Sequence, residues 1–335
     1  MYTNEDLNKA IDRGIFTTNA VDEFRQMVSE NKPSPEVDEE NFRLISGFND
    51  IFVVIASLLM LISASWVVGE INELLSMVVV AILSWGLAEF FVRKRKMSFP
   101  AIVLLVTFVG SIFFASITMF ETYFHIGLDS YRALSSAITI IFTYLHWRRF
   151  AVPITVASGV LVAILFVIST ILSISPQLED YIFFLTLLAG MTTFVLALRW
   201  DMKDTKRVTK NTDVAFWLHL ISSPLIVHSI FSLIGVFDYN SDGMAIIINI
   251  IILYIILSSI SLIIDRRAFM VSSLAYVVYA LNSLFSIYGI ENNSFAIVGV
   301  IIGFSLLLLS AYWTKVRKLL LKLMPQFVRD RVPLA

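Results

Sequence analysis

Residues 213–235 read DVAFWLHLISSPLIVHSIFSLIG, a stretch long enough to cross a lipid bilayer as one helix. The stretch also contains polar groups that a spanning helix usually lacks. His219 and His228 are two of the four histidines in the protein, and Pro224 follows a pair of serines. Ionisable groups within a membrane are costly and therefore informative about function. We expect any specific chemistry of this protein to lie in this stretch.

The composition of the whole chain indicates a multi-pass membrane protein. Of its 335 residues, 58% are hydrophobic and 15% are charged, and the mean hydropathy is +0.82. Soluble domains are typically roughly half apolar and a quarter charged. The net charge is −1 and no basic face is concentrated, so no nucleic-acid partner is expected. Cysteine is absent, which excludes disulfides, thiolate metal sites and cysteine nucleophiles.

From Asp50 onward, apolar runs alternate with short polar breaks, and a spanning helix needs about 20 mostly apolar residues. The sequence therefore predicts an all-α bundle of short-looped hairpins with ten spans, at residues 51–69, 73–92, 99–120, 131–146, 151–174, 181–199, 214–236, 244–264, 268–289 and 295–313. If residues 1–50 are cytoplasmic, every lysine and arginine except Arg132 falls on the same side. The positive-inside rule then places both termini in the cytoplasm.

Residues 1–46 are predicted to form a cytoplasmic helical hairpin followed by an acidic linker. Thr3 or Asn4 can cap the first helix, Gly14 fits its end, and Thr17 or Thr18 can cap the second helix. The linker contains two prolines and several acids. Two interpretations stay open for residues 1–50: a docking module for a protein partner, or a simple appendage.

The other end of the predicted membrane domain (residues 47–314) carries two packing signals. Gly299 and Gly303 lie four residues apart in the tenth run, a spacing that lets helix backbones approach closely. This face is predicted to pack on another helix, either within the chain or in a homo-oligomer. Residues 315–335 form a basic amphipathic tail, which we expect to lie along the anionic inner surface of the membrane.

Basic turns recur along the chain, at RKRKMSFPAI, HWRRFAVPI and DRRAFMVSS. This pattern indicates either an internal duplication of two-helix units or the similarity that any series of short-looped hairpins shows under the positive-inside rule. Both interpretations stay open.

At GFNDIFVVIASLLML (47–61) and again at DVAFWLHLISSPLIVH (213–228), the chain resembles a group of uncharacterised bacterial multi-pass membrane proteins. These carry a domain of unknown function, with a short helical region before many spans. The resemblance implies a bacterial inner-membrane setting. It supplies no activity and no site residues.

Few ionisable groups fall within the predicted spans. Glu89 lies four residues before Arg93, a favourable spacing for an ion pair on a helix. His219 and His228 are nine residues apart and point to opposite faces of an ideal helix, so they cannot bind one metal together. We therefore expect no metal and no cofactor. Pro224 is predicted to kink its helix, and the preceding serines can satisfy the carbonyls that it frees.

Three polar side chains on consecutive predicted helices lie at similar depth. His228, Asn249 and Asn282 are about 12, 8 and 10 Å below the outer end of their helices, at 1.5 Å per residue. They could line one pocket that opens to the outer side, with His219 and Pro224 in the same helix as His228. Alternatively, each group bonds a neighbouring helix and only holds the bundle together.

Three functional classes follow from these features. The first is a protein that binds or transports a small, uncharged or weakly polar ligand through the pocket of His228, Asn249 and Asn282. The second is a membrane scaffold that acts through the N-terminal hairpin and the helix-packing faces. The third is an intramembrane enzyme that uses His219 or His228. No hydrolase, nucleotide-binding or zinc-protease motif supports the third class, and no catalytic residue is predicted.

Overall fold

The computed structural model describes residues 4–31, 48–124, 127–204, 207, 209–236, 243–287, 294–329 and 331–333. Within these ranges the chain forms helices and turns, with no strand. Contacts within the chain separate residues 1–41 from residues 42–335. The all-helical class predicted from the sequence is confirmed for the described residues.

The first unit is a pair of helices, α1 (Asn4–Asp12) and α2 (Thr18–Asn31). Gly14 adopts a φ of 68°, the left-handed conformation in which glycine commonly ends a helix. At the start of α2, the Thr17 hydroxyl accepts a hydrogen bond from the Ala20 N–H at 3.2 Å. Gly14 and Thr17 therefore lie at helix boundaries as predicted, whereas Thr3 lies outside the described residues. The predicted acidic linker lies outside the described residues.

The second unit contains the apolar helices. These are α3 (Phe48–Gly69), α4 (Glu73–Ala88) with its π-helical extension η1 (Glu89–Lys94), α5 (Ser98–Tyr123), α7 (Ile154–Ile174), α8 (Ile182–Lys203) preceded by η2 (Pro176–Tyr181), α9 (Lys210–Leu233), α10 (Gly243–Ile264), α11 (Ala268–Ile287) and α12 (Ser294–Leu323). By length and composition, nine segments of the described chain can cross a membrane. This fits a multi-pass membrane protein.

The fourth predicted span corresponds to α6 (Leu128–Phe150), which is not among those nine segments. At 23 residues α6 is long enough, but its buried face is polar rather than aliphatic. Ser135, Ser136 and Thr139 are all fully buried there, and Thr139 donates to the Ser135 carbonyl. Its polar residues face the bundle interior, which explains why hydropathy alone does not identify this helix.

The four turns α4–α5, α6–α7, α8–α9 and α10–α11 share a backbone feature. Each contains one non-glycine residue with a positive φ: Lys96 (55°), Ala151 (51°), Arg207 (53°) and Asp265 (59°). Left-handed residues commonly follow the ends of helices, so this feature fits both a repeated two-helix unit and an ordinary series of hairpins, and both interpretations stay open. We call the end of the bundle that carries these turns the basic end.

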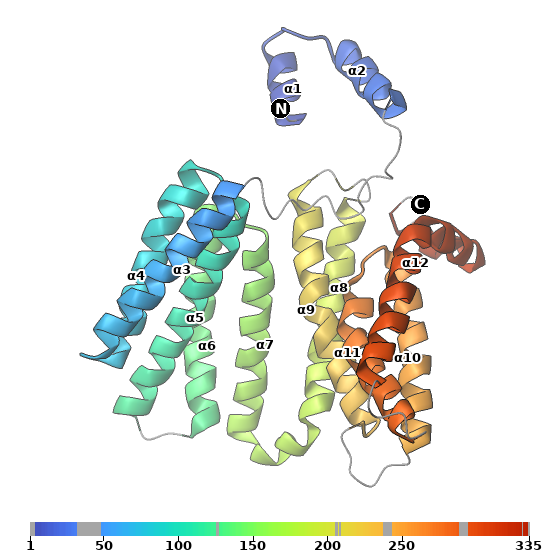
Figure 1. Cartoon of the computed structure of the whole chain (residues 1–335). Coiled ribbons are helices and arrows are strands. Elements are labelled where there is room, and N and C mark those ends of the chain that lie inside the picture. The colour runs from blue at the N-terminus through green and yellow to red at the C-terminus, as the bar shows by residue number, and fades with distance from the viewer. Residues whose placement is uncertain are drawn as a thin grey trace. The chain divides into compact units, whose positions relative to one another are not determined.

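Figure 1 shows α3–α7 grouped on one side of the second unit and α8–α12 on the other. Within the second group, α8 and α9 pack closely because Gly190 has no side chain. A Cβ atom at Gly190 would lie 2.8 Å from Cγ1 of Ile226. The α7 helix joins the two groups through a core cluster of Ala157, Ala197, Val214 and Leu218, which come from α7, α8 and α9.

The last long helix, α12, has few buried residues in its apolar part. It continues without a break through Lys315 and ends at Leu323, and the short helix α13 (Gln326–Arg329) follows Pro325. The predicted amphipathic tail therefore begins as part of the spanning helix.

Candidate functional site

Three ionisable side chains from three elements meet at the basic end of the α8–α12 group. Asp201 comes from the end of α8, His219 from α9 and Arg266 from the α10–α11 turn, and their side chains are 6%, 1% and 1% exposed. Nε2 of His219 lies 2.7 Å from Oδ2 of Asp201. Nη2 of Arg266 donates to Oδ1 of Asp201 at 2.6 Å and to the Thr212 carbonyl at 3.3 Å. One carboxylate thus joins a histidine and an arginine.

A second buried carboxylate belongs to Asp265, which directly precedes Arg266 in the sequence. Nη1 of Arg207, in the α8–α9 turn, donates to Oδ2 of Asp265 at 2.9 Å. Two side chains of α12 also approach Asp265: the Trp313 indole N–H donates at 2.9 Å, and Arg317 forms an ion pair at 3.6 Å. Burial lowers the pKa of the Arg207 guanidinium below its ordinary value. Asp265 therefore connects the two turns to the last helix.

A third carboxylate, Asp204, organises the start of α9. Its Oδ2 accepts hydrogen bonds from the Thr209 N–H at 2.7 Å, from the Thr209 hydroxyl at 2.6 Å and from the Thr212 hydroxyl at 3.0 Å. These donors include a backbone N–H near the α9 N-terminus, where negative charge is favourable. Asp204 thus fixes the turn that carries Arg207.

We call Asp201, Asp204, Asp265, Arg207, Arg266, Arg317, His219 and Trp313 the charged network. Its three aspartates balance its three arginines, so the network is neutral when His219 is neutral. Buried charges in a membrane protein are expensive and are retained where they pair with one another. The arrangement ties α8, α9, the α10–α11 turn and α12 together at one end.

The sequence did not predict this network. Arg207, Arg266 and Arg317 counted as basic residues of loops and tail, where the positive-inside rule expects solvent-exposed cations. The signal that could have revealed it is the alternation of acids with arginines in DMKDTKR (201–207) and DRR (265–267). A loop that only follows the positive-inside rule has no need of those carboxylates.

Within the network, His219 has one ring nitrogen without a partner. When Nε2–H donates to Asp201, Nδ1 is an acceptor, and this buried atom has no hydrogen bond in the structure. The ring of Phe194 packs on the imidazole edge with centroids 5.5 Å apart. Ser222 and Ser223 both donate to the His219 carbonyl. The carbonyl that lacks its helical donor is the next one, that of Leu220, because Pro224 has no N–H. The two serines therefore bond the carbonyl before it and not the one that Pro224 frees.

His228 lies on the same helix as His219 but in a different environment. Its side chain is exposed on the bundle surface, and Nδ1 lies 2.6 Å from the hydroxyl of Tyr276 on α11. The ring of Phe183, from the start of α8, is 5.7 Å away. Pro224, between the two histidines, is also exposed, and α9 runs through it from Lys210 to Leu233.

The two asparagines of the predicted pocket lie on α10 and α11. Asn249 is exposed on α10, and Asn282 is half-buried on α11. Nδ2 of Asn282 donates to the Val278 carbonyl of its own helix at 3.1 Å. These contacts do not test whether His228, Asn249 and Asn282 share one pocket, so the pocket stays a prediction.

The glycines of α12 face open space in the single chain. A Cβ atom at Gly299 or Gly303 would meet no described atom within 4 Å. Packing of this face against a second protomer therefore stays a prediction. Elsewhere, no set of three histidine, aspartate or glutamate side chains that could hold a metal ion occurs among the residues described.

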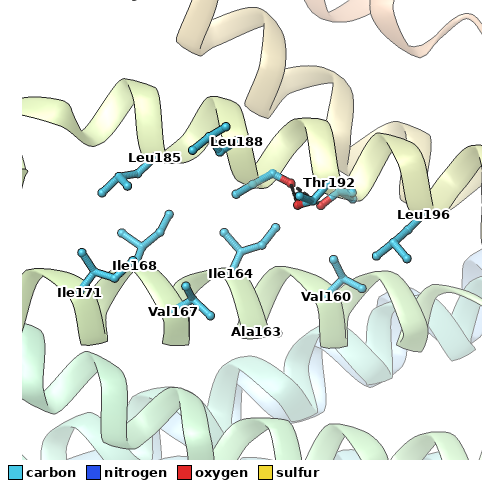
Figure 2. A pocket seen from close by; sticks show the side chains of 12 residues that line it. Val160, Ala163, Ile164, Val167, Ile168, Ile171, Leu185, Leu188, Thr192 and Leu196 are labelled. Atoms are coloured by element: carbon cyan, nitrogen blue, oxygen red, sulfur yellow. Dashed lines mark hydrogen bonds between the residues drawn. The ribbon is translucent and has the colours of Figure 1, made fainter.

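A cavity of about 420 Å³ lies between α7 and α8. Figure 2 shows aliphatic side chains from the two helices facing each other across it. The lining residues are Val160, Ala163, Ile164, Val167, Ile168 and Ile171 of α7, with Leu185, Leu188, Ala189, Thr192, Thr193 and Leu196 of α8. Both threonine hydroxyls donate to the Ala189 carbonyl at 2.8 Å, so they offer little to a polar ligand. We call this cavity the α7–α8 groove.

Sequence reasoning missed the groove because it placed α7 and α8 as adjacent spans with no polar residue at mid-depth. Aliphatic positions on two neighbouring helices predict packing, and the sequence contains no signal that these two helices leave a cavity between them. Three comparisons, with protein-family models, with curated proteins and with solved structures, give no match for the chain. The resemblance noted above therefore stays a prediction, and no activity is transferred from a relative.

Proposed function

We propose that this protein binds a small apolar or weakly polar ligand inside the membrane, as a binding or transport protein, and that the α7–α8 groove is the binding site. The observation that carries the proposal is the groove itself. Its walls are aliphatic along their length, and its few hydroxyls are already bonded to the backbone. Ligand sites are typically concave, mostly apolar and about 300–1,000 Å³ in volume.

The buried surroundings of the groove also support binding. Ala157, Ala197, Val214 and Leu218 form a packed cluster where α7, α8 and α9 meet. The charged network fixes the ends of α8 and α9 near this cluster. The groove thus lies beside a part of the bundle with a well-defined geometry, which favours a preformed site.

The experiment uses purified protein in lipid nanodiscs and methyl stearate with a nitroxide near the end of its chain. Electron paramagnetic resonance then measures the fraction of immobilised probe. Ala163→Trp fills the groove from α7, and Leu188→Trp narrows it from α8. Both substitutions should lower the immobilised fraction. The matched control is Ala56→Trp, because Ala56 is exposed on α3. Equal immobilisation in all four proteins would refute the proposal.

The pocket of His228, Asn249 and Asn282 is a second candidate for the same function. The observation in its favour is the pairing of an exposed histidine with the Tyr276 hydroxyl, which places two polar groups at one position between α9 and α11. A scaffold that uses residues 1–50, and an enzyme that uses His219 or His228, are the alternative classes.

The proposal includes a topology. We place ten spans in a bacterial inner membrane, namely the nine apolar segments and α6. The basic end and both termini then lie in the cytoplasm. The positive-inside rule supports this orientation. Because the chain has no cysteine, single cysteines at Asn19 and at Asn72 can be tested for labelling by an impermeant maleimide in intact cells. The topology requires labelling of Asn72→Cys only.

A further inference from the structure

The face of α8 that lines the groove continues beyond the groove toward the basic end. Leu188, Thr192 and Leu196 recur at a spacing of four residues, which keeps them on one side of the helix. Arg199, Trp200 and Lys203 follow Leu196 by three, four and seven residues, spacings that also share one face of a helix. Two cations and an indole therefore extend the apolar wall on the same side of α8.

These cations are available to a ligand. Arg199 and Lys203 are both exposed, and the part of the chain that the structure describes shows no ion pair for either. Nζ of Lys203 lies 4.9 Å from the ring centroid of Trp200. The intervening Asp201 does not neutralise them, because its carboxylate is buried against His219 and Arg266. Positive charge therefore collects at one end of the groove.

The dimensions of the groove favour a hydrocarbon chain. The lining extends from Leu185 to Leu196 on α8 and from Val160 to Ile171 on α7, which is about 16 Å along each helix at 1.5 Å per residue. This is about the depth of one leaflet, since the hydrocarbon core of a bilayer is about 30 Å thick. An extended acyl chain can therefore lie along the axis of the groove.

We propose that the α7–α8 groove holds one acyl chain of an anionic phospholipid, whose phosphate binds Arg199 and Lys203. The proposal rests on the proposed function and names its ligand class. Tryptophan and basic residues commonly lie at the level of lipid headgroups, and basic residues there attract anionic lipids. Trp200 marks that level beside the two cations. A zwitterionic lipid also has a phosphate, but its own headgroup cation offsets that negative charge and weakens the attraction to Arg199 and Lys203.

The test uses nanodiscs with spin-labelled phosphatidylglycerol or spin-labelled phosphatidylcholine, each labelled near the end of one chain. The wild-type protein should immobilise phosphatidylglycerol in preference to phosphatidylcholine. The double variant Arg199→Gln/Lys203→Gln should lower this preference roughly thirtyfold, since two basic residues near the surface together contribute about 2 kcal/mol to anionic-lipid binding. The matched control is Lys94→Gln/Arg95→Gln, in the α4–α5 turn, which should keep the preference.

The outcomes separate this inference from the proposed function. If Ala163→Trp reduces immobilisation of both lipids but the Arg199/Lys203 variant behaves as wild type, the groove binds chains without reading the headgroup, and the inference is wrong. If Ala163→Trp changes neither lipid nor methyl stearate, the groove is not a binding site and both proposals fail. If the Lys94/Arg95 control loses the preference equally, the effect is general surface charge, and the inference is also wrong.

Discussion

Nη2 of Arg266 lies 2.6 Å from Oδ1 of Asp201, although the two residues are 65 positions apart in the chain. Glu89 and Arg149, 60 positions apart, form the corresponding pair in the α3–α7 group, with Nη2 of Arg149 donating to Oε2 of Glu89 at 3.1 Å. In both cases an acid at the basic end of one hairpin pairs with an arginine at the turn of the next. The first pair is buried and the second is exposed, so the two pairs form a natural comparison.

Removing the carboxylate of Asp201 should destabilise the protein strongly. Asp201→Asn leaves the Arg266 guanidinium buried with its charge uncompensated, and breaking a buried pair in this way typically costs about 3–5 kcal/mol. Thermal unfolding in detergent measures the effect. Glu89→Gln, in the exposed pair, should change stability little because exposed ion pairs are screened by solvent. The double variant Asp201→Asn/Arg266→Gln should recover part of the loss. A similar melting temperature for Asp201→Asn and wild type would contradict the prediction.

Alanine should have opposite effects at two glycines. At Gly190, a Cβ atom would lie 2.8 Å from Cγ1 of Ile226 and 3.1 Å from its backbone nitrogen, so α8 and α9 must move apart. We expect Gly190→Ala to cost about 1–3 kcal/mol, as overpacking typically does. At Gly86, inside α4, a Cβ atom meets nothing within 4 Å. Gly86→Ala should be neutral or stabilising by about 0.5–1 kcal/mol, because alanine favours helices. Paired unfolding measurements give the sign at each site.

The predicted pocket on α9, α10 and α11 can be tested by chemical accessibility. In the cysteine-free chain, His228→Cys, Asn249→Cys and Asn282→Cys each provide a single thiol. If the three positions line one water-filled cavity, all three thiols should react with a water-soluble maleimide at similar rates. A cysteine at exposed Ile248, next to Asn249 on α10, is the control that should react slowly. Slow reaction at two or more of the three pocket positions would show that they face lipid or other helices.

The open glycine face of α12 predicts a contact between protomers. Gly303→Ile places a branched side chain where two helix backbones would meet, so it should abolish a dimer that uses this face. Mass photometry in nanodiscs measures the mass of the assembly. Val300→Leu, at an exposed position of the same helix, is the control that should keep it. If the wild-type protein is monomeric, the predicted contact between protomers is wrong.

The sequence was informative where local physics decides the structure. Thr17 and Gly14 bound the N-terminal helices because capping depends on a few neighbouring residues. The Glu89–Arg93 ion pair was predicted from a spacing of four residues and is confirmed at 3.3 Å. Hydropathy predicted the apolar helices, whereas the burial of the polar face of α6 depends on helices that are distant in the sequence.

The sequence was less informative where distant segments meet. Asp201 and Arg266 appeared as ordinary members of polar turns, because nothing in their neighbourhood shows that the two turns are packed together. His219 was singled out from the sequence, but its partner Asp201 could not be identified without the fold. The α7–α8 groove depends on how far apart two aliphatic helices lie, and aliphatic composition does not specify that distance.

The contact between Asp265 and Trp313 has a consequence for how the protein is made. The ribosome translates α10 and α11 before it reaches residue 313. Asp265 is therefore synthesised 48 residues before Trp313, which supplies the indole N–H, and Arg317 follows shortly afterwards. A nascent chain that is interrupted within α12 carries this acid with two of its donors missing. The last helix therefore completes the network, and a polypeptide that ends before Trp313 lacks both of these partners of Asp265.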